Sequence, residues 1–317
     1  MKTVVVCFFY ETERAYIRNY ERSVDTYFER FETWARVHNE MIVFVQDKYK
    51  ERVINIRKKY SLENRTHVVV FEKTLEEMFP QEYAMCKKNI DSSDLTYNVI
   101  RMMPTFTSVN YCIVTCAKFR LLKWASDIVN EECNFLYVDF GLADLGTYSL
   151  KTEDFDREIS TESFPNDLIT VYTYDEIKTT VPVYSLIRYA IGHFYTNIMI
   201  VPSKQCNWLE EKFYDCFRTI LRVGLTAQDQ NVMYMLWREN PENFNVIIQN
   251  YPYERYLKLL DLKEEQIKCI LPHKGLLYEK LRKTKLKKFV QWYKICKENR
   301  SYMNREKTYI KEIVKQR

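Results

Sequence analysis

The stretch Phe135-Leu-Tyr-Val-Asp-Phe-Gly-Leu-Ala-Asp-Leu-Gly146 runs from an apolar strand into an acidic turn. It holds two of the five glycines in a chain of 317 residues, and no glycine comes before Gly141. Average usage of about 7% would give roughly 22 glycines. Glycine is needed where φ is positive or where a ligand approaches the backbone closely. We therefore expect a ligand site around Asp139, Gly141 and Asp144.

Strands and helices alternate on the N-terminal side of this stretch. The strands are short apolar runs, and the helices carry apolar residues three or four positions apart. The expected strands are Val4–Phe9, Met41–Val45, His67–Phe71 and Phe135–Val138, and the expected helices are Arg14–His38, Lys48–Tyr60, Leu75–Asn89 and Val109–Asn130. This order predicts an α/β fold, a mostly parallel sheet with helices on both faces. Asp139 then lies at the carboxyl end of a strand, where ligands bind in open sheets of this kind.

Beyond the acidic turn the sequence predicts further elements of the same domain. They are a loop at Asp154–Pro165, strands Leu168–Tyr174 and Phe194–Val201, and helices Cys206–Val223 and Asp229–Glu239. The composition changes near Pro272, where a lysine-rich segment begins. We expect one domain over residues 1–275 and a basic helical tail over residues 276–317.

The net positive charge of the chain comes from the tail. It has 14 Lys and Arg against 4 Asp and Glu, whereas residues 1–275 have 34 against 39. Aromatic residues such as Trp292 interrupt the lysines, a pattern typical of a helix at a membrane surface. The alternative is that these aromatic residues pack on the body. Nucleic acid is not expected as a partner, since the aromatic residues match no recognisable DNA or RNA module.

The rest of the composition favours a cytoplasmic protein, and the basic tail leaves association with a membrane open. No apolar run reaches the roughly 18 residues that a spanning helix needs. The apolar run at Val4–Phe9 is too short for a signal peptide and predicts a buried strand. The nine cysteines are scattered without a Cys-x-x-Cys pair, as expected for reduced thiols in a core.

The acidic turn suits a divalent cation, since Mg²⁺ and Mn²⁺ prefer oxygen ligands and bridge to phosphates. Asp139-Phe-Gly141 also occurs in protein kinases, but the sequence has no upstream glycine-rich loop and no His-Arg-Asp. The same absence of glycine excludes the P-loop and the dinucleotide-binding fingerprint. The turn therefore predicts a metal or ligand site of another class.

Two later segments carry polar side chains in apolar surroundings. Asp229 and Gln230 lie at the start of a predicted helix. Asp229 either stabilises the first turn of this helix, as acidic residues commonly do, or has a functional role, in which it binds sugar hydroxyls or acts as a base. His193 follows Gly192 directly before the predicted strand Phe194–Val201, which contains Asn197, and His193 is either a core histidine or a binding residue. The sequence leaves both alternatives open.

The ordered set of motifs resembles the HtrL/YibB family, which is itself similar to GT-A glycosyltransferases. The resemblance covers roughly residues 3–250. The matching segments are Tyr10-Glu-Thr-Glu-Arg14 after the first strand, Tyr137-Val-Asp139-Phe-Gly141, Gly192-His193-Phe194, Asp229-Gln230 and Asn240-Pro241. The resemblance implies a GT-A-like, nucleotide-sugar-dependent transferase.

The resemblance also implies roles for individual residues. The donor site would comprise Phe9, Tyr10, Arg14, Lys118, Asp139, Gly141 and Gln230; the metal site would comprise Asp139, Asp144 and His273; His193 and Asn197 would contact the acceptor. Arg120 is a second candidate for a phosphate clamp beside Lys118. Asp229 would be the base in an inverting enzyme and would position the sugar in a retaining one.

One departure from the family of GT-A enzymes concerns the metal. These enzymes often carry Asp-x-Asp, whereas this chain has Gly141 two residues after Asp139. Asp144 would have to supply the second carboxylate if Mn²⁺ or Mg²⁺ is bound. The expected partners are a nucleotide-sugar donor, with UDP-linked sugars as the first candidates, and a glycan or lipid-linked acceptor, with peripheral membrane contact through the tail.

Two other function classes remain open from the sequence. The incomplete Asp-x-Asp is compatible with a nonenzymatic carbohydrate- or nucleotide-binding protein on a transferase scaffold. The basic tail is compatible with an adaptor that attaches to a membrane or to a nucleic acid.

Overall fold

The computed structural model describes residues 1–13, 22–92, 107–142, 151–173, 176–189, 193–249 and 254–262. The chain divides into two units, Met1–Ile267 and Lys268–Arg317, and the following description concerns the first. Several predicted site residues lie outside the described residues, as do Gly192 and the tail over residues 276–317. These site residues are Arg14, Asp144 and His273.

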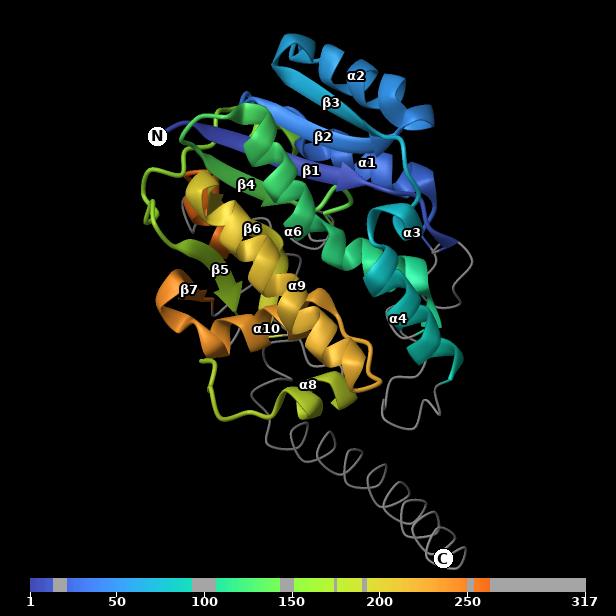
Figure 1. Cartoon of the computed structure of the whole chain (residues 1–317). Helices are drawn as coiled ribbons and strands as arrows, with labels where there is room; N and C mark the ends of the chain where they lie inside the picture. The colour runs from blue at the N-terminus through green and yellow to red at the C-terminus, as the bar shows by residue number, and fades with distance from the viewer. Residues whose placement is uncertain are drawn as a thin grey trace, which may run out of the picture. The chain divides into compact units, whose positions relative to one another are not determined.

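A seven-stranded sheet forms the centre of the first unit (Figure 1). Its order is β3-β2-β1-β4-β6-β5-β7. The strands are β1 (Thr3–Phe9), β2 (Met41–Gln46), β3 (Thr66–Phe71), β4 (Asn134–Val138), β5 (Ile169–Thr173), β6 (Phe194–Pro202) and β7 (Phe244–Ile248). Every adjacent pair is parallel except the two pairs that β6 makes with β4 and β5. The predicted fold class, a mostly parallel α/β sheet, is confirmed.

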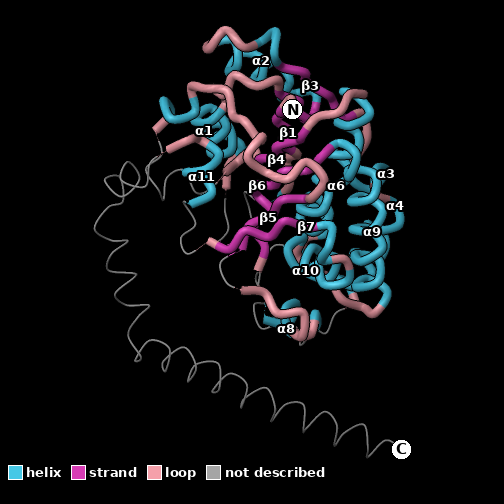
Figure 2. The backbone as a smooth tube through the Cα atoms, turned by 90° about the vertical axis from the view of Figure 1, so that its left-hand side faces the viewer, coloured by secondary structure: helices cyan, strands magenta, loops and turns pink. Residues whose placement is uncertain are grey.

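Helices cover both faces of this sheet, as the sequence predicts (Figure 2). The face with Val5 and Leu136 packs against α1 (Val24–Trp34) and α11 (Glu254–Leu259). The opposite face, with Val4 and Phe135, belongs to the main core, to which the other large helices contribute. These helices are α4 (Pro80–Asp91), α6 (Val109–Val129), α9 (Cys206–Arg222) and α10 (Asp229–Glu239). Burial on both faces explains why the central strands read as continuous apolar runs.

Helix α6 is the element that carries a lysine to the end of the sheet. Its first turn is capped by Ser108, whose Oγ accepts a hydrogen bond from the Tyr111 amide at 3.0 Å. It ends at Asn130, which has a left-handed φ of 47°. Its middle packs on α9, with the Phe119 and Phe213 ring centroids 3.6 Å apart. These contacts fix the helix along the core face of the sheet.

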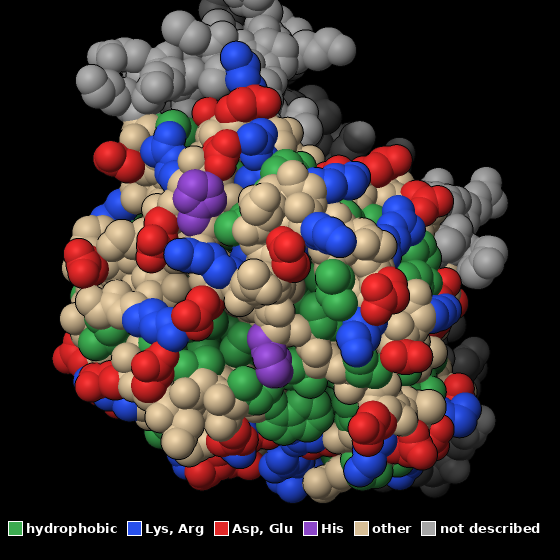
Figure 3. Space-filling view, turned by 90° about the horizontal axis from the view of Figure 1, so that it is seen from above, with side chains coloured by type: hydrophobic (Ala, Val, Ile, Leu, Met, Phe, Trp, Pro, Cys, Tyr) green, Lys and Arg blue, Asp and Glu red, His purple; other side chains and the backbone are tan. Residues whose placement is uncertain are grey.

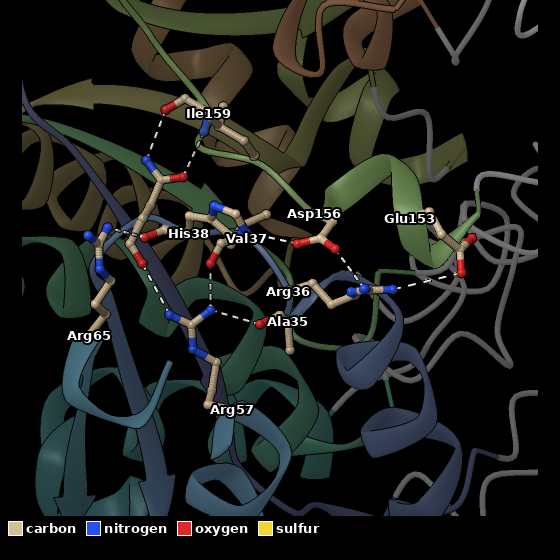
Figure 4. Close-up of polar contacts among 10 residues, drawn as sticks. Ala35, Arg36, Val37, His38, Arg57, Arg65, Glu153, Asp156 and Ile159 are labelled. Atoms are coloured by element: carbon tan, nitrogen blue, oxygen red, sulfur yellow. Dashed lines mark hydrogen bonds and ion pairs between the residues drawn. The ribbon is translucent and has the colours of Figure 1, made fainter. Parts of the chain in front are cut away.

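The amino ends of the strands are held by a buried arginine in α2 (Lys50–Lys58). Arg57 donates hydrogen bonds to the carbonyls of Ala35 and Val37 at 2.7 and 2.6 Å and to that of Asn39 at 3.1 Å (Figure 4). Its Nε donates to Thr66 Oγ1 at 2.8 Å. Burial lowers the pKa of Arg57 to about 10, so the side chain stays charged near neutral pH. One side chain thus fixes the connection between α1 and β2.

A second set of polar contacts links the connection between α1 and β2 to the loop over residues 156–161. The carboxylate of Asp156 accepts from Arg36 Nη2 at 2.7 Å and lies 2.8 Å from His38 Nε2 (Figure 4). Nearby, the Asn39 amide group donates to the Ile159 carbonyl and accepts from the Ile159 amide. The loop over residues 156–161 is therefore tied to the first half of the sheet.

The face of the molecule seen from above in Figure 3 mixes acidic and basic side chains. Surface ion pairs of the first unit include Lys59 with Glu32 at 2.6 Å and Arg52 with Asp25 at 2.7 Å. Exposed pairs of this kind contribute about 0–1 kcal/mol each. Among the described side chains drawn there, no broad area carries a single sign of charge.

Some element boundaries differ from the predicted ones. The described part of the first helix is α1, which ends at Trp34 rather than His38. The helix predicted over Leu75–Asn89 is two helices, α3 (Leu75–Met78) and α4, because Pro80 disfavours helical backbone at Phe79 and begins a new helix. Strand β7, α8 (Val183–Tyr189) and α11 were not predicted.

Two predictions about composition can be compared with the described residues. The seven cysteines among them are buried and free of disulfides, as expected for core thiols. No helix in the described ranges is long and apolar enough to cross a membrane.

Candidate functional site

A cleft opens at the carboxyl ends of β1 and β4, where the sequence analysis places the ligand site. Its cavity volume is about 130 Å³, smaller than the roughly 300–1,000 Å³ of most small-molecule sites, so the cleft is shallow. Its lining includes Tyr10, Tyr27 and Tyr111 together with Lys118, Asp139 and Gly141. The cleft therefore combines aromatic walls with charged groups at one end of a parallel sheet.

Lys118 of α6 is the centre of the charged group. Its Nζ lies 2.9 Å from Asp229 Oδ2 and 3.3 Å from Asp139 Oδ1, and it donates to the Thr196 carbonyl at 3.1 Å. The side chain is only 5% exposed. Burial alone would lower the pKa of Lys118, but the two carboxylates outweigh it and hold the pKa above its ordinary value. All three N–H donors of the ammonium group thus have partners within the protein.

Asp139 is the carboxylate of this group that reaches the cleft. Its amide donates to the Asn197 carbonyl at 2.8 Å, which fixes the backbone at the end of β4. Its Oδ1 accepts from the Tyr137 hydroxyl at 2.7 Å as well as from Lys118. Burial, followed by the charge of Asp139, raises the pKa of Tyr137 well above its ordinary value, so the hydroxyl stays a donor. The Asp139 side chain remains 39% exposed and available to a ligand.

Asp229 lies behind Lys118 at the first position of α10. Its Oδ2 accepts from Thr196 Oγ1 at 2.5 Å and from Lys118. The side chain is 10% exposed and is not part of the cleft lining. Lys118 and Thr196 therefore connect the carboxylate to α6 and β6, and both contacts use the same carboxylate oxygen.

Gly141 is required by a close contact rather than by its backbone angles. A Cβ at this position would lie 2.3 Å from Cδ1 of Tyr27, inside van der Waals contact. The preceding ring, Phe140, stacks on Phe31 with centroids 4.3 Å apart, and the Phe140 carbonyl accepts from Trp34 Nε1 at 3.3 Å. A side chain at position 141 would therefore collide with the Tyr27 ring, and Gly141 itself lines the cleft.

Phe9 and Tyr10, which the resemblance assigns to the donor site, line the cleft but differ in exposure. Phe9 is only 4% exposed and packs in an aromatic cluster, with its ring 5.2 Å from those of Tyr27 and Tyr49. Tyr10 is half-buried, and its ring lies 5.6 Å from that of Phe71. Tyr10 therefore offers more ring surface to a ligand than Phe9 does.

The remaining predicted residues lie around the cleft rather than in it. The His193 ring lies 5.9 Å from the Tyr234 ring, and Asn197 contributes its carbonyl to Asp139. Gln230 is half-buried at the start of α10 and does not line the cleft. Arg120 points to the other side of α6, where its Nε donates to Glu210 at 2.8 Å. The idea that Arg120 clamps a phosphate is therefore not supported by its position.

Four residues of the site were not predicted from the sequence. Tyr137 and Thr196 hold the two aspartates, and Tyr27 and Arg22 line the cleft beside Gly141. A polar Tyr two residues before Asp139 in an apolar strand was a usable signal, because alternate strand residues share a face. Nothing in the local sequence connects Tyr27 with Gly141.

Asp139 is the described residue of the cleft that could bind a divalent cation. Oxygen ligands suit Mg²⁺ and Mn²⁺, which commonly take one or two carboxylates and complete their shell with water and phosphate. Within the described ranges, no three His, Cys, Asp or Glu side chains converge as a metal site. Asp139 thus fits as a single protein ligand, and Asp144 and His273 lie outside the described residues.

The sequence matches a family model over residues 1–256, described as a bacterial protein of unknown function (HtrL_YibB). The chain belongs to the HtrL_YibB family. The suspected membership is therefore confirmed over most of the chain, and it assigns no activity to this HtrL_YibB member.

Two solved structures are similar to the chain at low identity. Mouse xyloside xylosyltransferase 1 in its apo form has 11% identity and a TM-score of 0.38, with 82% of this chain and 94% of that chain covered. The PaToxG glycosyltransferase has 13% identity and a TM-score of 0.32, with 76% and 70% covered. No curated protein matches the sequence. Similarity this distant leaves the chemistry to be argued from the residues of the cleft.

Proposed function

We propose that this protein is a GT-A-like glycosyltransferase that takes a sugar from a nucleotide-sugar donor, with UDP-linked sugars as the first candidates. The observation that carries the proposal is the position of Asp139. It lies at the carboxyl end of β4, half-exposed in an aromatic-walled cleft, and Lys118 and Tyr137 hold its Oδ1. A fixed carboxylate beside aromatic rings suits a ligand with a base, hydroxyl groups and phosphates.

The chemistry requires the bond between the sugar and the diphosphate to break while an acceptor hydroxyl attacks the anomeric carbon. A Mn²⁺ or Mg²⁺ ion held by Asp139 would neutralise charge on the departing diphosphate. Lys118 has a different role from the predicted donor contact, because its three donors are already used inside the protein. It holds Asp139 and Asp229 at a fixed separation.

Asp229 is the proposed base if the sugar is inverted. Both of its contacts with Lys118 and Thr196 use Oδ2, so Oδ1 is the oxygen that would accept the hydroxyl proton. In a retaining enzyme Asp229 would instead orient the donor sugar. A glycan or lipid-linked acceptor would approach from the side of His193 and Asn197, with Gln230 near the donor sugar.

The test uses a panel of UDP-, GDP- and CMP-sugars, each with and without Mn²⁺. For each donor, the thermal unfolding of the protein and the hydrolysis of the donor are measured. A ligand at a hundredfold excess over its Kd stabilises the folded state by about 2.7 kcal/mol. Asp139→Asn is expected to lose the shift. Asp127→Asn, an exposed aspartate on the same helix as Lys118, is the matched control and should keep it. No shift and no hydrolysis with any donor would refute the proposal.

The same panel separates the enzyme from a nonenzymatic binding protein. The incomplete Asp-x-Asp at Asp139 and Gly141 is the feature that favours binding without turnover. A donor that stabilises the protein but is neither hydrolysed nor transferred, with or without Mn²⁺, would support that second function.

A further inference from the structure

Two buried polar side chains lie at the ends of β5 and β7. Because β6 runs antiparallel to both β4 and β5, and β5 runs parallel to β7, the strands β4, β5 and β7 all end at the same edge of the sheet. Tyr172 is close to the end of β5, and Gln249 directly follows β7, where its amide donates to the Thr173 carbonyl at 2.8 Å. Both residues therefore lie at the edge that also holds Asp139.

The register of β5 and β7 places these two side chains on one face of the sheet. Thr170 pairs with Asn245, Tyr172 pairs with Ile247, and Gln249 is two residues beyond Ile247. Alternate residues of a strand share a face, so these side chains form two neighbouring rows. At the start of the rows, Asn245 Nδ2 donates to Thr170 Oγ1 at 3.1 Å. The polar groups of that first pair thus satisfy each other.

The polar atoms at the other end of the rows are not paired in this way. Tyr172 and Gln249 are each 1% exposed. Within the part of the chain that the structure describes, the Tyr172 hydroxyl and both polar atoms of the Gln249 side chain make no hydrogen bond. Buried polar groups are nearly always paired, because each unpaired one destabilises the folded state. Two unpaired side chains at the ligand edge of the sheet therefore indicate a binding role.

The chemistry of the two groups suits a sugar. An amide group offers donors and acceptors, and a phenol hydroxyl can do either, which matches sugar hydroxyls that also do both. Burial raises the pKa of Tyr172 well above its ordinary value, so its hydroxyl keeps the proton. Neither group is charged, so a phosphate would find no counter-charge on them.

The two groups also lie beside the strand that holds the proposed base. Tyr172 pairs with Tyr195 of β6. The next residue of β6 is Thr196, whose Oγ1 donates to Asp229 Oδ2 at 2.5 Å. A sugar bound at the ends of β5 and β7 would therefore be next to the part of the sheet that positions Asp229.

We propose that Tyr172 and Gln249 bind hydroxyl groups of the acceptor, which is then a glycan. This inference rests on the proposed function and adds the class of acceptor and two residues that recognise it. The acceptor side would extend from His193 and Asn197 across β5 to β7. Because Tyr172 and Gln249 are covered, a sugar reaches them when the surrounding chain moves, and their unpaired polar atoms favour that movement.

The first experiment uses thermal unfolding to separate a binding role from a structural one. Gln249→Leu removes a buried amide group that has no partner, so its Tm should equal or exceed that of wild type. Asn89→Leu is the matched control, because Asn89 is also buried but donates to the carbonyls of Leu221 and Leu225 at 2.8 and 2.9 Å. Its Tm should fall. A fall in Gln249→Leu as large as that in Asn89→Leu would overturn the inference.

The second experiment measures binding of a panel of methyl glycosides of common hexoses and pentoses to the full chain by saturation-transfer NMR. Gln249→Leu should weaken the bound glycoside about tenfold or more and Tyr172→Phe about threefold or more, since the first removes two polar atoms and the second removes one. Asn89→Leu should bind as wild type does. Equal binding by wild type and Gln249→Leu, or no glycoside bound by wild type, would overturn the inference.

The two kinds of ligand separate this inference from the proposed function. Glycoside binding that depends on Gln249, without binding or hydrolysis of any nucleotide sugar, supports the sugar site and refutes the transferase. Donor hydrolysis that depends on Asp139, with glycoside binding unchanged in Gln249→Leu, supports the transferase and refutes the role of Gln249. A wild type that binds neither kind of ligand refutes both.

Discussion

Lys118 Nζ lies 2.9 Å from Asp229 Oδ2, so a buried ion pair joins α6 to α10 next to the cleft. Both side chains are at most 10% exposed, and Asp139 shares the same ammonium group. A buried pair is weak evidence for stability in itself, but removal of one partner leaves an uncompensated charge. The pair therefore makes the stability of the protein depend on the residues of its site.

Lys118→Met should destabilise the protein by about 3–5 kcal/mol, because it leaves Asp139 and Asp229 without their counter-charge. Urea unfolding measures the change. Lys123→Met, on the same helix but partly exposed, is the control and should change stability little. In the double variant Lys118→Met/Asp229→Asn part of the loss should be recovered. A Lys118→Met protein as stable as wild type would contradict this account.

Asp229→Asn should lower kcat for sugar transfer by about 10²- to 10⁴-fold if Asp229 is the base, with a small change in donor KM. The amide keeps an oxygen for Thr196 and Lys118, so the fold should be retained. Steady-state kinetics and near-ultraviolet circular dichroism check both points. A normal kcat with a raised donor KM would instead assign Asp229 to positioning the sugar.

Arg57→Met should destabilise the protein by about 3 kcal/mol or more, although Arg57 lies far along the chain from every site residue. The substitution removes the hydrogen-bond donor to the carbonyls of Ala35, Val37 and Asn39. Each buried carbonyl that stays unsatisfied lowers the free energy of unfolding by about 1–3 kcal/mol. Lys58→Met, at the next and exposed position, is the control. A Tm of Arg57→Met equal to that of Lys58→Met would contradict the prediction.

Asp156 should make the stability of the folded protein depend on pH in the acid range. The hydrogen bond with His38, together with Arg36, lowers the pKa of Asp156 below its ordinary value of 3.8. The stabilisation is therefore present above 3.8 and is lost as the pH falls through the folded-state pKa. The difference in urea unfolding between wild type and Asp156→Asn should be constant at pH values well above 3.8 and should shrink as the pH is lowered below 3.8. A difference that stays constant below pH 3.8 would contradict the assignment.

Residues 276–317 should bring the protein to anionic membranes, a prediction that rests on the sequence alone. Each Lys or Arg near such a surface contributes about 1 kcal/mol. Deletion of these residues should reduce sedimentation with phosphatidylserine vesicles and leave binding to neutral vesicles unchanged. Equal sedimentation of the full chain and the deletion variant with these vesicles would contradict a role of the tail in membrane binding.

Much of the first half of the fold could be predicted from the sequence. The strands β1, β2 and β4 are buried on both faces, so each appears in the sequence as a continuous apolar run that predicts a buried strand. β7 was missed because Phe244–Ile248 includes Asn245 and three of its residues are only half-buried, which weakens the run. Nothing in Phe194–Pro202 indicates that this strand runs opposite to its neighbours.

The site was predicted where chemistry is carried by local motifs and missed where it depends on distant contacts. Asp139 follows a strand, so its place at the cleft could be inferred. Arg57 lies in a polar helix whose sequence gives no sign of a buried arginine. The contact between Tyr27 and Gly141 joins residues on different elements, and only the folded chain brings them together.

The antiparallel strand β6 has a consequence for synthesis on the ribosome. β4 pairs with β1 on one side and with β6 on the other, so this central strand has an open edge until residues 194–202 have been made. An open strand edge with apolar residues is prone to pairing with another chain. The nascent protein therefore passes through a stage at which a chaperone that covers the β4 edge would protect it from aggregation.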